Sequence, residues 1–356
     1  MHSASSAGGM LSGSPSAGLK AYARAIKLLQ RASNAPDSAA HLEDAIAAAE
    51  NMGIIEWFLR ARGADLGVDK GCLTHWAGNA ALISSRVTMR PSELICASVY
   101  TSGVRTFYPA AFTGTVSLFE ALRWMEAEPP SVYVAPPEFS RLRKVAHKLF
   151  ICLPRLMRDV RALKAGDSQM LSVALKLADA LMLFEDREAE DWLLHRVALT
   201  KTTDKEDHGI VPFSFMFRGV SEMDVAILYW QTRLMILRLH AILKQRENNN
   251  NAPAPASKEE LRFAKNILMS WQYADASKPF GGMSMTLALL AAWGALRYEG
   301  SVGGLSSNKL RVWIWRAISR SFLSWIFGET AADMDAAANV LSGGPLFEYT
   351  RSLFQA

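Results

Sequence analysis

Apolar residues recur at helical spacing along most of the chain. After Ser16, a candidate N-cap, the residues Leu19, Tyr22, Ile26 and Leu29 follow an i, i+3, i+7 pattern, which indicates one face of a helix. Similar patterns predict further helices over residues 138–163, 170–199, 225–243, 283–298 and 309–327. No alternating run is long enough for a sheet, and VPFSFMF at residues 211–217 only interrupts the helical rhythm. The pattern therefore predicts an all-α fold, either a multi-helix bundle or an irregular helical array, without a significant sheet.

Local signals refine several of these helices. Ser257 and Glu260 have the spacing of a capping box, and Ser221 with Asp224 is expected to cap the helix over 225–243. That helix is apolar on nearly every face, which predicts a central helix surrounded by others. Pro154 lies inside the helix over 138–163 and is expected to kink or divide it.

Stretches rich in Ser, Gly, Asn and Pro indicate how the chain is organised. Residues 1–18 read as a disordered lead-in, and residues 19–356 as one helical domain with possible halves at 19–165 and 166–356. The low-complexity stretch NNNNAPAPAS at 248–257 predicts an exposed, mobile loop.

Composition limits the classes of function. The chain is 50% hydrophobic and 21% charged, which is typical of a globular protein with a large core. Its three cysteines are too dispersed for a disulfide framework or a C-x-x-C metal knuckle, which favours a reducing compartment. The longest apolar run, Met283–Leu296, is too short to cross a bilayer, so no membrane span is expected. A net charge of +5 spread along the chain does not by itself indicate nucleic-acid binding.

The stretch GCLTHWAGNAALISSR at residues 71–86 is a candidate chemical site. Cys72 and His75 are three residues apart and would share a helix face, so both could reach one ion. A zinc site needs three or four protein ligands, and no second cysteine is near. We therefore interpret the edge formed by Cys72, His75 and Asn79 as a helix contact, with Gly78 allowing close approach of a neighbour.

The acidic run FEDREAEDW at residues 184–192 invites comparison with the magnesium-binding carboxylates of helical prenyl-diphosphate enzymes. Those enzymes place a D-D-x-x-D/E cluster in a cavity opposite a second polar motif. Here Arg187 interrupts the run, no partner motif is present, and the acids spread round the helix: Glu185, Asp186, Glu188, Glu190 and Asp191. We expect a solvated charged face.

The stretch KLRVWIWRAISR at residues 309–320 combines aromatic and basic residues, as a surface that stacks single-stranded nucleic acid does. However, Trp313 and Trp315 point to different faces of a helix and cannot form one platform. At least one is expected in the core, with the bases on the wet side: Lys309, Arg311, Arg316 and Arg320. The common hydrolase, nucleotide-binding and zinc-protease motifs are absent from the sequence, so no catalytic, cofactor-binding or metal-binding residue is assigned.

Four stretches, taken in order, resemble the regulatory domain of fungal zinc-cluster transcription factors. The first, residues 22–50, resembles the early helix pair of that domain, and residues 71–86 resemble its W-x-x-H-x-x-G-A-x-x-L-I-x-x-R-G pattern. Residues 212–243 resemble its aromatic segment and "LYW" helix, and residues 281–300 with the Trp/Arg-rich helix after them resemble its C-terminal core. The sequence departs from the pattern at Cys72, Asn79 and Val87, and it lacks the six-cysteine zinc cluster that grips DNA in that family.

The resemblance implies a non-enzymatic helical module of transcription regulation. Its partners would be the transcription machinery or co-regulator proteins, with a small-molecule inducer as a further ligand, and its location would be the nucleus. Direct DNA binding by this chain is not expected, and zinc would enter only through a cluster outside it. Two alternatives stay open: an all-α enzyme of unknown class, with an apolar pocket lined by Tyr229, Trp230, Trp293 and Tyr298, or a helical scaffold protein.

Overall fold

A computed structural model gives the arrangement of the chain. It describes residues 23–24, 26–27, 39–61, 71–85, 107–126, 136–164, 166–203, 207, 209–249, 255–277, 280–297, 301–302, 305–321 and 330–348. The expected lead-in at 1–18 and residues 250–254 of the expected loop at 248–257 lie outside these residues. The described part is mostly helical, which confirms the all-α prediction.

The chain divides into two compact units, Met1–Pro109 with Ala356, and Ala110–Gln355. The first contains α3 (Ala39–Ala61) and α4 (Gly71–Ser85), which pack against each other. The possible halves at 19–165 and 166–356 do not coincide with these units, since the helices on either side of residue 165 belong to the same unit.

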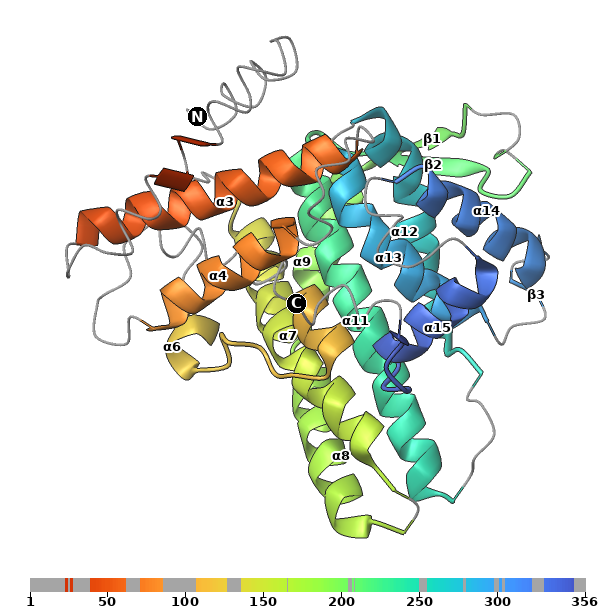
Figure 1. Ribbon diagram of the computed structural model, residues 1–356. Helices are drawn as coiled ribbons and strands as arrows, with labels where there is room; N and C mark the ends of the chain where they lie inside the picture. The colour runs from red at the N-terminus through yellow and green to blue at the C-terminus, as the bar shows by residue number, and fades with distance from the viewer. Residues whose placement is uncertain are drawn as a thin grey trace. The chain divides into compact units, whose positions relative to one another are not determined.

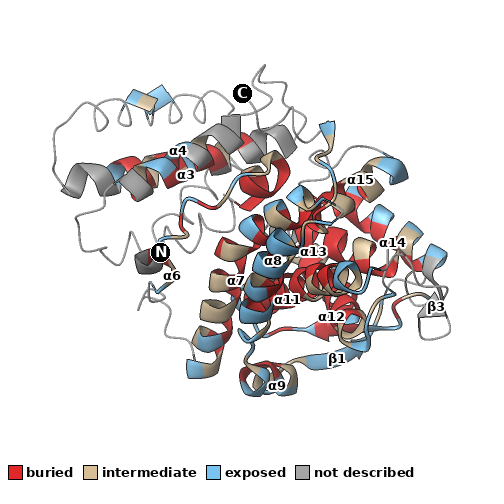
Figure 2. Ribbon diagram, turned by 90° about the horizontal axis from the view of Figure 1, so that it is seen from below, coloured by how far each residue is buried: buried red, intermediate tan, exposed pale blue. Residues whose placement is uncertain are grey.

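The second unit is built round one long helix, α11 (Val220–Glu247). It contacts α7 (Pro137–Ala162) and α8 (Ser168–Met182) on one side, and α12 (Lys258–Ala276) and α13 (Phe280–Leu296) on the other (Figure 1). Buried residues gather on α11, α12 and α13 (Figure 2). The prediction of a central, all-round apolar helix is therefore confirmed.

Smaller elements complete this unit. They are α6 (Leu122–Met125), α9 (Arg187–Arg196), α14 (Ser307–Ser319), α15 (Ala331–Leu341) and the two antiparallel pairs β1 (Ala198–Lys201) with β2 (Phe213–Met216), and β3 (Ser301–Val302) with β4 (Leu305–Ser306). In the first pair Leu199 lies opposite Phe215. Strand β2 lies against α12, where the Ser214 hydroxyl donates to the Met269 carbonyl at 2.9 Å. Part of the stretch at 211–217 thus forms a short strand, β2. The strand is stabilised by packing against α12, a helix distant in the sequence, so the local pattern could not predict it.

Several predicted boundaries change. The helix expected over 170–199 is two helices, because the Asp186 side chain accepts a hydrogen bond from the Ala189 amide and begins α9. Helix α11 begins at Val220 rather than after a cap at Ser221, since the Glu222 carboxylate accepts a hydrogen bond from the Arg218 amide at 3.1 Å. Helix α7 continues through Pro154 without division. The capping box of Ser257 and Glu260 is confirmed.

None of the helices among the described residues is long and apolar enough to span a bilayer.

Candidate functional site

The predicted Cys72–His75 stretch forms α4, which packs on α3. His75 Nε2 lies 3.1 Å from Glu56 Oε1, and Asn79 Nδ2 donates to Glu50 Oε1 at 3.4 Å. Both contacts agree with the packing interpretation, while the side chain of Cys72 lies outside those described. No group of three or more His, Cys, Asp or Glu side chains that could hold a metal ion occurs among the described residues.

The glycine that permits this contact is not the predicted one. No described atom lies within 4 Å of a Cβ built on Gly78, whereas a Cβ on Gly53 would lie 2.5 Å from Trp76 Nε1. The close approach therefore occurs at Gly53 of α3, and the expectation for Gly78 was wrong.

The acidic run is where the structure differs most from expectation. The side chain of Glu190 is only 3% exposed, so the run is not simply a solvated face. Glu190 lies on the inner side of α9, where its Oε1 accepts hydrogen bonds from Trp230 Nε1 at 2.8 Å and Arg262 Nη1 at 2.7 Å. Its Oε2 accepts from Arg262 Nη2 at 3.0 Å. A buried carboxylate is held by donors from α11 and α12, which meets the requirement for burying a charge.

Arg262 connects this carboxylate to a second one at the surface. Its Nη2 donates to Glu259 Oε1 at 2.7 Å, and its guanidinium lies 4.3 Å from the centre of the Phe263 ring. Burial alone would lower the pKa of Arg262, but the hydrogen bonds that Arg262 donates to Glu259 and Glu190 outweigh it and raise the pKa. The hydrogen bond from Arg262 in turn lowers the pKa of Glu259. We call Glu190, Trp230, Glu259 and Arg262 the buried charge cluster.

Two other acids of the run, Glu185 and Asp186, have structural partners as well. Glu185 Oε2 lies 2.8 Å from Nη2 of the buried Arg233, whose Nη1 donates to the carbonyls of Met182 and Phe184 at 3.0 and 3.1 Å. Arg233 therefore satisfies carbonyls at the end of α8, which helix geometry leaves without partners. Asp186 pairs with Arg141 of α7 at 2.9 Å in addition to capping α9.

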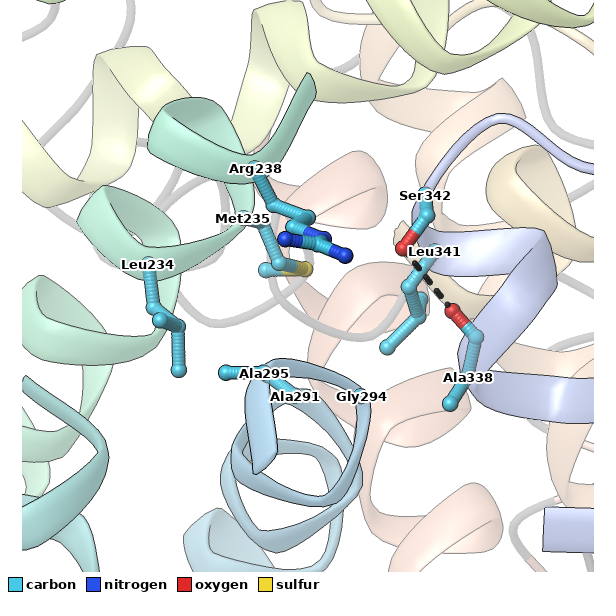
Figure 3. Close-up of a pocket in the computed structure, with 9 residues that line it drawn as sticks. All are labelled: Leu234, Met235, Arg238, Ala291, Gly294, Ala295, Ala338, Leu341 and Ser342. Atoms are coloured by element: carbon cyan, nitrogen blue, oxygen red, sulfur yellow. Dashed lines mark hydrogen bonds between the residues drawn. The ribbon is translucent and has the colours of Figure 1, made fainter. Parts of the chain in front are cut away.

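A small cavity lies beside another buried ion pair. Arg238 Nη1 is 3.7 Å from Glu260 Oε1, and their side chains are 7% and 1% exposed. Figure 3 shows the Arg238 guanidinium directed into the space between α11, α13 and α15. The cavity measures about 10 Å³, close to the space of one water molecule. It is lined by Leu234, Met235, Arg238, Ala291, Gly294, Ala295, Ala338, Leu341 and Ser342.

The described members of the apolar set considered for an enzyme do not line the cavity beside Arg238. Tyr229 and Trp230 are 1% and 0% exposed, and neither lines the cavity. Burial raises the pKa of Tyr229 to about 12, and its hydroxyl accepts a hydrogen bond from the Asp186 amide. Trp293 donates to Asp335 at 2.9 Å, and Tyr298 lies outside the described residues.

The basic and aromatic helix agrees with the prediction except at Arg311, which was expected on the solvent-exposed side. Trp313 is 4% exposed and Trp315 is 40% exposed, so the two rings lie on different sides of α14 and form no common platform. Arg311 is directed inward, against the Trp293 ring at 4.2 Å and Asp335 at 2.7 Å. Lys309, Arg316 and Arg320 are exposed.

Taken together, the buried charges of the second unit join helices. Sequence reasoning did not single out Arg233, Arg238 and Arg262, which supply the cations. The sequence could have predicted a role for Arg233 and Arg238, because an arginine inside a helix that is apolar on all faces needs a buried partner. Arg262 lies three residues after Glu259, and that spacing predicts only a surface pair.

Comparisons of the chain with protein-family models, with curated proteins and with solved structures found no match.

Proposed function

We propose that this chain is a non-enzymatic helical module of transcription regulation, of the type found in fungal zinc-cluster transcription factors, and that it acts in the nucleus through protein partners. The observation that carries the proposal is the order of the four resembling stretches along one chain. Two of them, residues 212–243 and 281–300, overlap the central elements β2, α11 and α13 of the second unit.

The use of buried charge supports a non-enzymatic role. Glu190 and Glu260 are the buried carboxylates of the second unit among the described residues, and each is held beside an arginine at a helix junction. A catalytic site needs polar groups that converge on a space for substrate. The cavity beside Arg238 has room for about one water molecule, so the proposal rests on protein partners and not on an inducer held there.

A tethering experiment tests the proposal. The full chain is fused to a heterologous DNA-binding domain and expressed in a fungal host with a reporter gene carrying that domain's sites. We expect reporter transcription to change severalfold relative to the DNA-binding domain alone, and a fluorescent fusion to collect in the nucleus. A stable fusion that leaves transcription unchanged would contradict the proposal.

DNA binding by the chain alone gives a second test. We expect no sequence-specific shift of DNA at physiological salt, because the contacts available are scattered basic side chains and such binding weakens steeply with salt. A specific complex with the isolated chain would show that it carries its own DNA-reading surface.

A further inference from the structure

Helix α8 carries a second apolar stripe, separate from the face that packs into the core. The core face is formed by Ala174, Leu175, Ala178 and Leu181, which are buried. The second stripe consists of Met170, Val173, Leu177 and Ala180 of α8, together with Phe184, which follows two residues after the helix ends at Met182. Met170 is 39% exposed, Val173 57% and Phe184 38%. We call these five residues the α8 stripe.

The spacing of the α8 stripe is that of a helix-pairing seam. Its four members on α8 follow one another at intervals of three, four and three residues, which is the heptad spacing that keeps apolar side chains facing a partner helix. A run of exposed apolar residues on one face of a helix is unusual for a surface that only meets water, and such faces mark interaction sites. The geometry fits an amphipathic helix laid along α8.

The charges beside the stripe are basic. Lys148 of α7 places its Nζ 5.7 Å from the centre of the Phe184 ring. Lys176 is exposed on α8 immediately before Leu177. Within the described part of the chain no ion pair joins either lysine to a carboxylate, whereas the nearby Asp179 is engaged by His240 at 2.9 Å. The stripe is thus bordered by positive charge that a partner can neutralise.

We propose that the α8 stripe binds an amphipathic helix of another protein, one whose apolar face is flanked by acidic residues. A second copy of the chain fits less well, because a two-fold pairing centred on Leu177 would bring two copies of Lys176 together. The inference names the kind of partner for the proposed regulatory function and rests on that function only for its biological role.

Binding of a designed probe tests this inference. The probe is a labelled synthetic helix of roughly 20 residues with Leu at heptad a and d positions and Glu at the flanking e and g positions. The matched probe has Lys in place of every Glu. We expect the full chain to bind the Glu probe, measured by fluorescence anisotropy, at least about tenfold more tightly than the Lys probe, a difference that charge complementarity can supply.

Variants of the chain locate the binding. Val173→Lys is expected to weaken binding of the Glu probe by about tenfold or more, because it places a charge in the seam. The matched control is Val312→Lys on α14, where the valine is 50% exposed, and it should bind as the parent does. The double variant Lys148→Glu/Lys176→Glu should reverse the preference between the two probes.

The results that would overturn the inference are distinct. Equal binding of both probes would show that the α8 stripe does not select an acidic helix. Binding unaffected by Val173→Lys, in a chain whose circular dichroism is unchanged, would show that the probe binds elsewhere. No binding of the Glu probe would do the same. A dimer in sedimentation that Val173→Lys abolishes would assign the stripe to a second copy. If the probe binds as expected while the tethered chain leaves reporter transcription unchanged, the α8 stripe is a helix-binding surface but the proposed role in transcription is wrong.

Discussion

Two helix junctions in this protein each join a carboxylate to a nitrogen base, and they do so at different depths. Between α9 and α12, Glu190 is 3% exposed and receives three hydrogen bonds from Trp230 and Arg262. Between α3 and α4, Glu56 and His75 are 10% and 19% exposed and lie 3.1 Å apart. The deeper junction uses the permanently charged, forked guanidinium of Arg262, whereas the shallower one uses a single ring nitrogen of an imidazole. A carboxylate buried as deeply as Glu190 needs a charged donor beside it, because an unmatched charge there is costly.

Removal of the permanent donor should have the largest effect. Arg262→Met leaves Glu190 buried with the Trp230 indole as its remaining donor, so we expect the free energy of unfolding to fall by about 3–5 kcal/mol. Urea denaturation of the parent and the variant measures this difference. The double variant Glu190→Leu/Arg262→Met removes both charges and should recover part of the loss. A loss below about 1 kcal/mol for the single variant would show that Glu190 is not held as described.

His147 of α7 extends the comparison, because it is buried as deeply as Glu190 but is kept neutral. Burial lowers its pKa from 6.5 to about 3. The folded state then binds fewer protons than the unfolded state below pH 6.5, so this contribution is complete above that pH and is lost as the pH falls toward 3. Between pH 7 and pH 5 we expect about 2 kcal/mol of stability to be lost through His147. Denaturation at both pH values should show the loss in the parent and not in His147→Leu.

Loss of the charge partner should reduce stability less at the shallower junction between α3 and α4. His75→Gln removes a partly exposed pair, and we expect a loss of about 0.5–1 kcal/mol. Amide hydrogen exchange of α3 measures the effect locally, and the exchange of α9 and α12 serves as the internal control. An effect as large as that of Arg262→Met would mean that burial does not separate the two junctions.

Removal of Glu259, the outer acid of the buried charge cluster, should have the smallest effect on stability. The side chain of Glu259 is 34% exposed, so Glu259→Gln is expected to cost about 0.5 kcal/mol or less at pH 7. Since the hydrogen bond from Arg262 lowers the pKa of Glu259, its contribution is present above the ordinary pKa of about 4.3 and is lost as the pH falls through the lowered value. Parent and variant should therefore converge in stability on acidification. A gap that widens at low pH would contradict the assigned ion pair.

Local patterns predicted the helical fold well because helices are specified by residues close in sequence. The central position of α11 and the Ser257–Glu260 capping box followed from spacing alone. The errors concern contacts made across the sequence. Residues 213–216 became a strand against α12, and Glu190 became buried because Arg262, 72 residues away, supplies its charge partner. A run of acids looks the same in sequence whether or not a distant arginine faces one of them.

Three arginines that complete helix ends have a consequence for the order of folding. Arg233 donates to carbonyls at the end of α8, Arg161 of α7 to the Gly344 carbonyl just after α15, and Arg246 to the Val160 carbonyl near the end of α7. Donor and acceptor are separated by 51, 183 and 86 residues respectively. These three hydrogen bonds at or just beyond helix ends therefore form only after segments distant in the chain have met. Because loop closure must precede such contacts, the helix ends of the second unit should become protected late and together, as the unit closes.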